Sequence, residues 1–93
     1  MNINTYADAI TAVLEKLGTI ASKYIPAKYG YEDEDKYFVQ ILNNPPVPDK
    51  LGGYSGSFVR KSDGEVWSEC MPKILSETKR MTPLVYENGI WYE

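Results

Sequence analysis

The sequence contains no histidine and only one cysteine, and it has no apolar run long enough to cross a bilayer. Histidine is the commonest general base and metal ligand, so its absence leaves any serine or cysteine nucleophile without its usual partner. Because Cys70 is alone, no disulfide can form within the chain, which suits a reducing cytoplasm. A signal peptide needs a basic region before an apolar one, and that pattern does not occur. We therefore expect a cytoplasmic protein without a membrane span or a cleaved signal.

Basic residues are fewer than acidic ones, with ten lysines and arginines against thirteen aspartates and glutamates and a formal net charge of −3. A general nucleic-acid binder needs a basic surface that displaces counterions, so we expect no direct contact with nucleic acid. The acidic balance is compatible with a basic protein partner, although many soluble proteins share it. The hydrophobic fraction of 43% and the length predict one globular domain over residues 1–93.

One strong helical pattern is present, over residues 5–25. Thr5 and Asp8 predict a capping box at its start, and Pro26, which lacks an amide donor, predicts its end within a turn. Gly18 falls inside this helix, at a cost of about 1 kcal/mol relative to alanine. Apolar residues recur at steps of three and four, which places them on one helix face. This stripe consists of Ile10, Val13, Leu14, Leu17, Ile20, Ala21 and Tyr24.

The rest of the chain reads as strands and turns. Residues 36–42 predict a strand with one strongly apolar face and one mixed face, in which Tyr37, Val39 and Ile41 alternate with Phe38, Gln40 and Leu42. Residues 54–60 and 65–70 predict a hairpin, because residues 61–64 supply turn chemistry and Gly64 is free to take positive φ. Between the two lies a connection over residues 43–53, which is too rich in proline for a central strand.

The last third predicts a short helix and a second hairpin. Pro72 suits the first helical position, and residues 73–81 follow with Ile74, Leu75 and Thr78 as the inward side chains. Asn88 and Gly89 predict a type I′ turn between strands over residues 84–87 and 90–93. The expected fold is α+β: a long amino-terminal helix packed on an antiparallel sheet of four or five strands, with a short second helix.

No motif of catalysis, metal binding or nucleotide binding is present, so we expect no enzyme, no catalytic residue, no metal and no cofactor. The glycines of residues 52–56 are not followed by a lysine in phosphate-loop spacing, and Cys70 is expected to be a buried small residue. The four adjacent carboxylates Glu32, Asp33, Glu34 and Asp35 lack the spacing of a calcium loop. We expect them on a solvated loop, where they can also attract a basic partner.

Aromatic residues outnumber what so small a core needs, and Trp and Tyr are enriched at interface hot spots. Trp67 lies within a predicted hairpin and is expected to pack inward. Trp91 and Tyr92 point to opposite faces of a strand, so one of them is available for binding. The candidate protein-binding residues form two patches, the first with Tyr29, Tyr31, Glu32, Asp33, Glu34 and Asp35, and the second with Trp91, Tyr92 and Glu93.

The order of these parts resembles a known family. The opening TYADAITAVL, the strand KYFVQI over residues 36–41 and the hairpin SFVRKSDGEV over residues 57–66 are similar to the small YrhB-like immunity proteins of bacterial polymorphic-toxin systems. The likeness covers roughly residues 5–70. It implies a cytoplasmic inhibitor that binds one toxin and has no catalysis of its own, and it carries over no binding residues.

Two other functions fit the same sequence. A small acidic α+β protein can be a phage anti-defence protein of the anti-CRISPR type, which blocks a host nuclease with carboxylates that imitate phosphates. It can also be a structural or regulatory subunit. Our hypothesis is that the protein inhibits a protein partner, a toxin or a nuclease, by stoichiometric binding, and the immunity protein is the main reading. The oligomeric state is left open.

Overall fold

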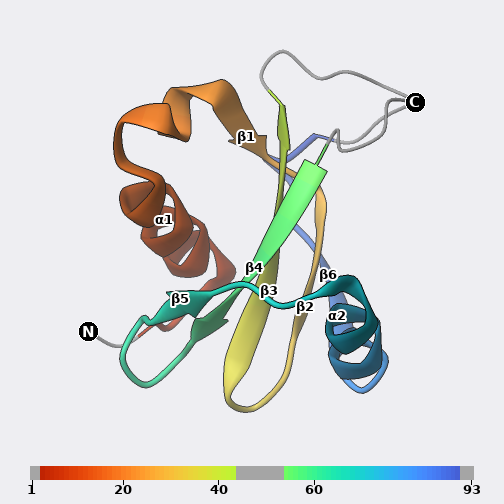
Figure 1. Ribbon diagram of the computed structural model, residues 1–93. Helices are drawn as coiled ribbons and strands as arrows, with labels where there is room; N and C mark the ends of the chain where they lie inside the picture. The colour runs from red at the N-terminus through yellow and green to blue at the C-terminus, as the bar shows by residue number, and fades with distance from the viewer. Residues whose placement is uncertain (1–2, 44–53, 91–93) are drawn as a thin grey trace.

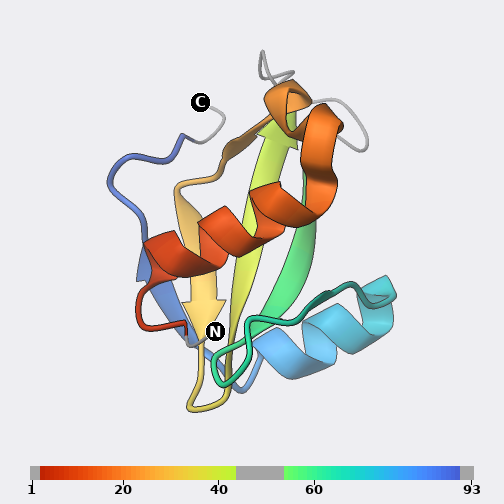
Figure 2. The same cartoon turned by 90° about the vertical axis from the view of Figure 1, so that its left-hand side faces the viewer.

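The structure is a computed structural model that describes residues 3–43 and 54–90 (Figure 1). A helix lies across one face of an antiparallel sheet, and a short second helix lies at the other face (Figure 2). This confirms the predicted α+β class. The elements, in chain order, are α1 Tyr6–Leu17, the 3-10 helix η1 Gly18–Lys23, β1 Tyr24–Pro26, β2 Tyr29–Glu32, β3 Lys36–Asn43, β4 Tyr54–Arg60, β5 Val66–Trp67, α2 Met71–Thr78 and β6 Thr82–Val85.

Helix α1 begins at the predicted capping box. Thr5 Oγ1 accepts a hydrogen bond of 3.1 Å from the Asp8 amide, and Asp8 Oδ2 accepts one of 3.3 Å from the Thr5 amide. The long amino-terminal helix is confirmed over residues 6–23, but only Tyr6–Leu17 is α-helical, because Gly18 takes φ 63° and ends the α-helix. A tighter 3-10 turn follows, and Pro26 lies in strand β1 rather than at the helix end. Because a 3-10 helix has fewer residues per turn than an α-helix, the side chains after Gly18 no longer continue the apolar stripe of α1. Ile20, predicted to lie on that stripe, is 43% exposed.

The sheet has the strand order β5-β4-β3-β2-β6, and β1 pairs with the carboxyl-terminal part of β3. Both β1 and β2 therefore line the same side of β3, β1 beside Ile41–Asn43 and β2 beside Tyr37 and Phe38. The sheet has six strands rather than the four or five expected. The predicted strand over residues 36–42 is confirmed as β3. The hairpin of β4 and β5 is confirmed too, with Gly64 at φ 76°, although β5 is shorter than expected.

Alternation along β3 separates two apolar clusters. Tyr37, Val39 and Ile41 face α1 and form the main core with its buried Ile10 and Val13. On the opposite face, Phe38 packs in a smaller cluster with Phe58 and Met81, against which Ile74 of α2 is partly buried. This cluster is where α2 is anchored.

Helix α2 confirms the predicted short helix, but not all of its inward side. Leu75 is 61% exposed, because a helix of eight residues touches the sheet with a narrow stripe on which Ile74 lies. Thr78 is half-buried and its hydroxyl donates to the Ile74 carbonyl at 2.9 Å.

The predicted carboxyl-terminal hairpin is wrong. The turn lies at residues 87–88, closed by a hydrogen bond of 3.0 Å from the Gly89 amide to the Tyr86 carbonyl, and not at the predicted residues 88–89. Strand β6 pairs with β2, and Ile90 forms a parallel bridge with Ala27. The Ile90 amide donates to the Pro26 carbonyl at 3.2 Å, and the Lys28 amide donates to the Ile90 carbonyl at 2.7 Å. These hydrogen bonds fill the gap between β1 and β2. Of the predicted connection over residues 43–53, Asn43 ends β3 and residues 44–53 lie outside the described part of the chain, as do the final residues 91–93.

Candidate protein-binding site

A row of aromatic side chains crosses the sheet on the face that α2 packs against. Tyr31, Phe38, Phe58 and Trp67 are register partners on the four strands β2 to β5. Their ring centroids are separated by 6.2, 4.9 and 5.6 Å in that order. The indole of Trp67 lies at the end of the row, stacked on Phe58 and half-buried. The prediction that Trp67 packs inward is therefore confirmed.

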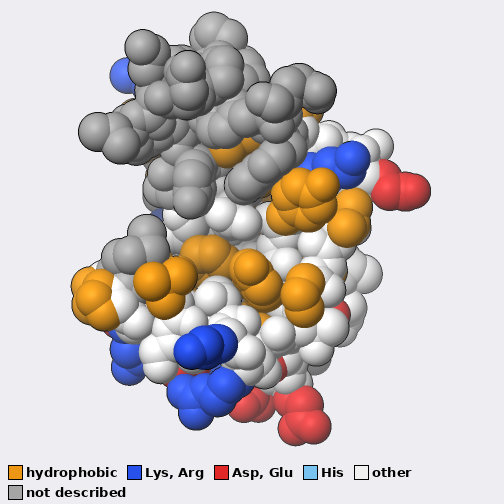
Figure 3. Space-filling model, turned by 90° about the vertical axis from the view of Figure 1, so that its right-hand side faces the viewer, with side chains coloured by type: hydrophobic (Ala, Val, Ile, Leu, Met, Phe, Trp, Pro, Cys, Tyr) orange, Lys and Arg blue, Asp and Glu red, His pale blue; other side chains and the backbone are white. Residues whose placement is uncertain are grey.

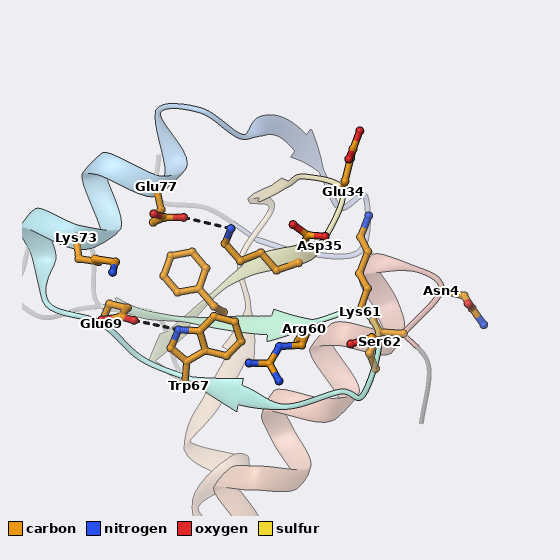
Figure 4. Close-up of a pocket in the computed structure, with 13 residues that line it drawn as sticks. Asn4, Glu34, Asp35, Arg60, Lys61, Ser62, Trp67, Glu69, Lys73 and Glu77 are labelled. Atoms are coloured by element: carbon orange, nitrogen blue, oxygen red, sulfur yellow. Dashed lines mark hydrogen bonds and ion pairs between the residues drawn. The ribbon is translucent and has the colours of Figure 1, made fainter.

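A cavity of about 740 Å³ opens over the Phe58 and Trp67 end of this row (Figure 4). Helix α2 supplies one wall, the turn between β2 and β3 supplies another, and the end of β4 supplies a third. The aromatic rings form the floor. The charged residues of the lining are Glu34, Asp35, Lys36, Arg60, Lys61, Glu69, Lys73 and Glu77.

Lys36 joins two walls of the cavity. Its Nζ lies 2.7 Å from Asp33 Oδ2 in the turn. It also lies 3.2 Å from Glu77 Oε1 on α2, a contact marked in Figure 4. Burial acts to lower the pKa of the Lys36 ammonium, but the hydrogen bonds to Asp33 and Glu77 outweigh it and raise that pKa. The amine is therefore a fixed positive charge that holds α2 against the turn.

Asp33 builds the turn between β2 and β3. Its Oδ1 accepts hydrogen bonds of 2.8 Å from the amides of Asp35 and Lys36, as in an Asx-turn. Partial burial acts to raise the pKa of Asp33, but these hydrogen bonds and the Lys36 ammonium outweigh it, so the pKa lies below its usual value. Asp33 is thus a structural residue rather than a free surface charge.

Arg60 lies over the face of Trp67. The guanidinium carbon is 5.4 Å from the indole centroid, and Nη1 is 3.0 Å from Asp63 Oδ2. On the other side of the ring, Trp67 Nε1 donates to Glu69 Oε2 at 3.1 Å (Figure 4). Arginine and tryptophan are the residue types most enriched at binding hot spots, and here each holds the other in place.

The first predicted patch is only partly brought together. Glu32 ends β2 instead of lying on a loop, and its carboxylate is 3.0 Å from Lys61 Nζ. Tyr31 is half-buried against Phe38. The four carboxylates are thus not equivalent, because Glu32 and Asp33 are in ion pairs. Glu34 and Asp35 are exposed, line the cavity, and make no ion pair with any residue in the described part of the chain.

Tyr29, the remaining residue of that patch, belongs to an apolar strip beside α2. It is 40% exposed and lies opposite Val85, which is 58% exposed, across the β2–β6 pair. Leu75 of α2 is also exposed. Figure 3, which views the molecule from the side of β6 and α2, shows hydrophobic side chains gathered in a band across this side.

The other predicted site residues have two outcomes. Trp91, Tyr92 and Glu93 lie outside the described residues. Cys70 is exposed, so the prediction of a buried cysteine is wrong. It is the N-cap residue of α2 and follows the end of β5, outside the sheet.

Sequence reasoning missed the basic and aromatic lining of the cavity, which consists of Lys36, Phe58, Arg60, Lys61, Trp67 and Lys73. A signal for part of it was present. The turn over residues 61–64 fixes the β4–β5 register, and that register places Phe58 opposite Trp67. No local pattern carries Lys73 of α2 to the same place.

Searches for known relatives add nothing to this picture. No protein-family model matches the sequence, and comparisons with curated proteins and with solved structures return no match. Among residues 3–43 and 54–90, no three His, Cys, Asp or Glu side chains are arranged to hold a metal ion. No helix within those residues is long and apolar enough to cross a membrane.

Proposed function

We propose that this protein is a non-catalytic inhibitor that binds one protein partner and blocks it, as a cytoplasmic immunity protein blocks its toxin. The observation that carries this proposal is the cavity beside Trp67, whose side chains are held by one another before any partner arrives. Lys36 is fixed by two carboxylates, Arg60 by Trp67 and Asp63, and Trp67 by Glu69.

Such a surface is suited to tight binding for a physical reason. Association costs about 0.5–1.5 kcal/mol for each long side chain that must be ordered, and side chains that are already ordered avoid that cost. A concave surface with an aromatic floor also allows a partner side chain to be fully desolvated, which is where hot-spot energy is concentrated.

The apolar strip provides additional contact area. Tyr29, Val85 and Leu75 lie on the same side of the sheet as α2 and are each exposed. A stable interface needs about 800 Å² from each partner, which is more than the mouth of one cavity supplies. The strip and the cavity both lie on the side of the sheet that α2 packs against, and together they form the candidate surface.

Co-expression tests the proposal. The protein would be produced in a bacterial host together with the product of each neighbouring gene in turn, and growth would be measured with and without it. We expect one neighbour to arrest growth when expressed alone and to be harmless with this protein present. A complex of fixed stoichiometry should then be isolated through a tag on this protein, with inhibition that saturates at that ratio.

Two results would contradict the proposal. Relief of toxicity at far less than one molecule per toxin would indicate turnover, and therefore an enzyme. Co-purification in a constant assembly without any effect on a toxic neighbour would indicate a structural subunit instead.

A further inference from the structure

The turn after β6 contains the only asparagine–glycine pair of the sequence, Asn88 and Gly89. The backbone nitrogen of a residue can attack the side-chain amide of an asparagine before it, and glycine hinders this attack least because it has no side chain. The other asparagines precede isoleucine, threonine, asparagine or proline. Asn88 is also exposed, so water reaches its side chain. The sequence and the exposure therefore single out this pair for deamidation.

Gly89 is held in place by its neighbours. Its amide donates a hydrogen bond of 3.0 Å to the Tyr86 carbonyl. Its backbone lies directly against Ala27, because a Cβ atom on Gly89 would lie far inside contact distance of the Ala27 carbonyl oxygen. Attack on Asn88 requires the Gly89 nitrogen to lose its proton and to turn toward the Asn88 side chain. These contacts oppose that movement until the segment opens locally.

The next residue, Ile90, anchors the segment between β1 and β2. Its amide donates to the Pro26 carbonyl at 3.2 Å, and its carbonyl accepts from the Lys28 amide at 2.7 Å. Because the preceding glycine is packed against backbone, a longer chain does not fit between the turn and Ile90. We call residues 88–90 the tether.

We propose that Asn88 is a site of spontaneous deamidation, which the folded tether slows and which opens the tether once it has produced isoaspartate. The Gly89 nitrogen forms a bond to Asn88 Cγ as the bond from Cγ to the side-chain nitrogen breaks. That nitrogen leaves as ammonia with the proton that Gly89 gives up, and a succinimide ring remains. Water then opens the ring at one of its carbonyls and produces aspartate or isoaspartate, with no oxidation or reduction in either step.

Isoaspartate changes the backbone of the tether. The chain then runs through Cβ and Cγ of residue 88, which makes it longer by one carbon atom, and the former backbone carbonyl becomes a carboxylate side group. The added carbon moves Gly89 off Ala27, so Ile90 loses its hydrogen bonds to Pro26 and Lys28. The tether lies outside the cavity beside Trp67, and its modification does not depend on the proposed function.

The pair of Asp63 and Gly64 offers an internal comparison. An aspartate forms the same ring by losing water, but it does so readily only when its carboxyl group is protonated. The Glu65 amide and the Arg60 guanidinium donate hydrogen bonds to the Asp63 carboxylate and hold its pKa below the usual value. Asp63 therefore stays ionised at neutral pH and should not react.

Ageing of the full chain tests the first part of the proposal. The protein would be kept in mildly alkaline buffer, folded or in urea, and its peptides analysed by mass spectrometry with enzymatic detection of isoaspartate. We expect deamidation at Asn88, at least about tenfold slower in the folded protein than in urea, and no isoaspartate at Asp63 in the folded protein.

A variant of the anchor locates the source of the protection. Ile90→Gly weakens the anchor without altering the reacting pair, and it should raise the rate in the folded protein at least about threefold. The matched control is Leu75→Gly, which removes an exposed aliphatic side chain from α2 and should leave that rate within about twofold.

Hydrogen exchange tests the second part. The isoaspartyl form would be separated from the parent by ion-exchange chromatography, and exchange of the Lys28 amide would be measured in both. We expect exchange at least about tenfold faster in the isoaspartyl form. Asn88→Asp carries the same added charge on an unaltered backbone, and its Lys28 amide should exchange within about twofold of the parent.

Several results would overturn the proposal. Equal rates of deamidation in the folded protein and in urea would show that the tether gives no protection. Unchanged exchange at Lys28 in the isoaspartyl form, or equally fast exchange in Asn88→Asp, would show that the longer backbone does not open the tether. Complete unfolding of the isoaspartyl form while Asn88→Asp stays folded would also contradict it, because the loss would then not be confined to the tether.

Discussion

The phenol of Tyr6, on α1, occupies the space where Gly30, on β2, would carry a side chain. A Cβ atom on Gly30 would lie far inside contact distance of Tyr6 Oη. The Tyr6 ring is also packed edge-on against Tyr37, with centroids 5.7 Å apart, so it cannot easily move aside. This contact sets how closely the helix approaches the sheet, and it explains a glycine in the middle of a strand.

Replacing Gly30 with alanine should therefore destabilise the fold, by about 1–3 kcal/mol, because the added methyl group overpacks the helix–sheet contact. Urea denaturation would measure the loss. The double variant Gly30→Ala with Tyr6→Leu should lose less stability than the sum of the losses in the two single variants, since the smaller side chain at position 6 leaves room for the added methyl group. Full additivity would show that the two residues do not compete for it.

The same tyrosine predicts a loss of stability in alkali. Burial raises the pKa of Tyr6 to about 12, against a smaller lowering by the Gln40 backbone. A pKa that is higher in the folded state means that the stabilisation is complete below pH 10 and is lost as the pH rises toward 12. At pH 11 the loss should be about 1 kcal/mol relative to pH 9. Denaturation curves of the wild type and Tyr6→Phe at both values isolate this loss, which the variant should lack.

Asp33 and Lys36 should contribute to the fold in separable ways. Asp33→Asn keeps a carbonyl oxygen for the two turn amides but loses the ion pair, whereas Asp33→Ala loses both, so alanine should cost about 1 kcal/mol more. Lys36→Met should destabilise by about 1–2 kcal/mol, because it leaves Asp33 and Glu77 without their shared cation. Thermal unfolding at neutral pH would rank the three variants, and equal losses for the two Asp33 variants would contradict the turn role.

The ion pair of Asp33 and Lys36 also predicts how stability changes at low pH. The pKa of Asp33 is lower in the folded state, so its stabilisation is present above the unfolded value and is lost as the pH falls through the folded one. Lys36→Met should lose less stability than the wild type on acidification below pH 4. A parallel decline in both proteins would show that Lys36 does not hold the Asp33 pKa down.

Cys70 should react in the native protein. Its side chain is exposed, so a thiol reagent such as dithionitrobenzoate should label one group per chain at nearly the rate found in denaturant. Labelling that waits for unfolding would restore the original prediction of burial. The single cysteine also offers a position for a fluorescent probe at the start of α2.

Local signals in the sequence identified those elements whose partners lie nearby in the chain. The capping box at Thr5 and Asp8 and the β4–β5 hairpin both depend on residues within a few positions of one another. Strand β2 was missed because Gly30 and the adjacent carboxylates favour a loop by composition. Tyr6 packs on the face of β2 at Gly30, and β6 pairs along one edge of β2. Both contacts come from distant parts of the chain and leave no local pattern in the sequence.

The candidate site divides in the same way. Of the predicted residues, Glu34, Asp35 and Tyr29 are exposed, and Glu34 and Asp35 line the cavity, whereas Tyr31 is half-buried. The sequence could not show that Glu32 and Asp33 are neutralised, since Lys61 reaches Glu32 from a different hairpin. Charge runs therefore overstate the free charge of a surface whenever the sheet register brings a base alongside.

The order of pairing has a consequence for how this chain folds during synthesis. Strand β6 closes the edge of β2, yet the two are separated in sequence by β3, β4, β5 and α2. Until β6 leaves the ribosome, the backbone amides and carbonyls of β2 have an open side on which a foreign strand can pair. Premature termination before β6 should thus produce a chain that self-associates, whereas chains that include β6 should stay monodisperse at high concentration.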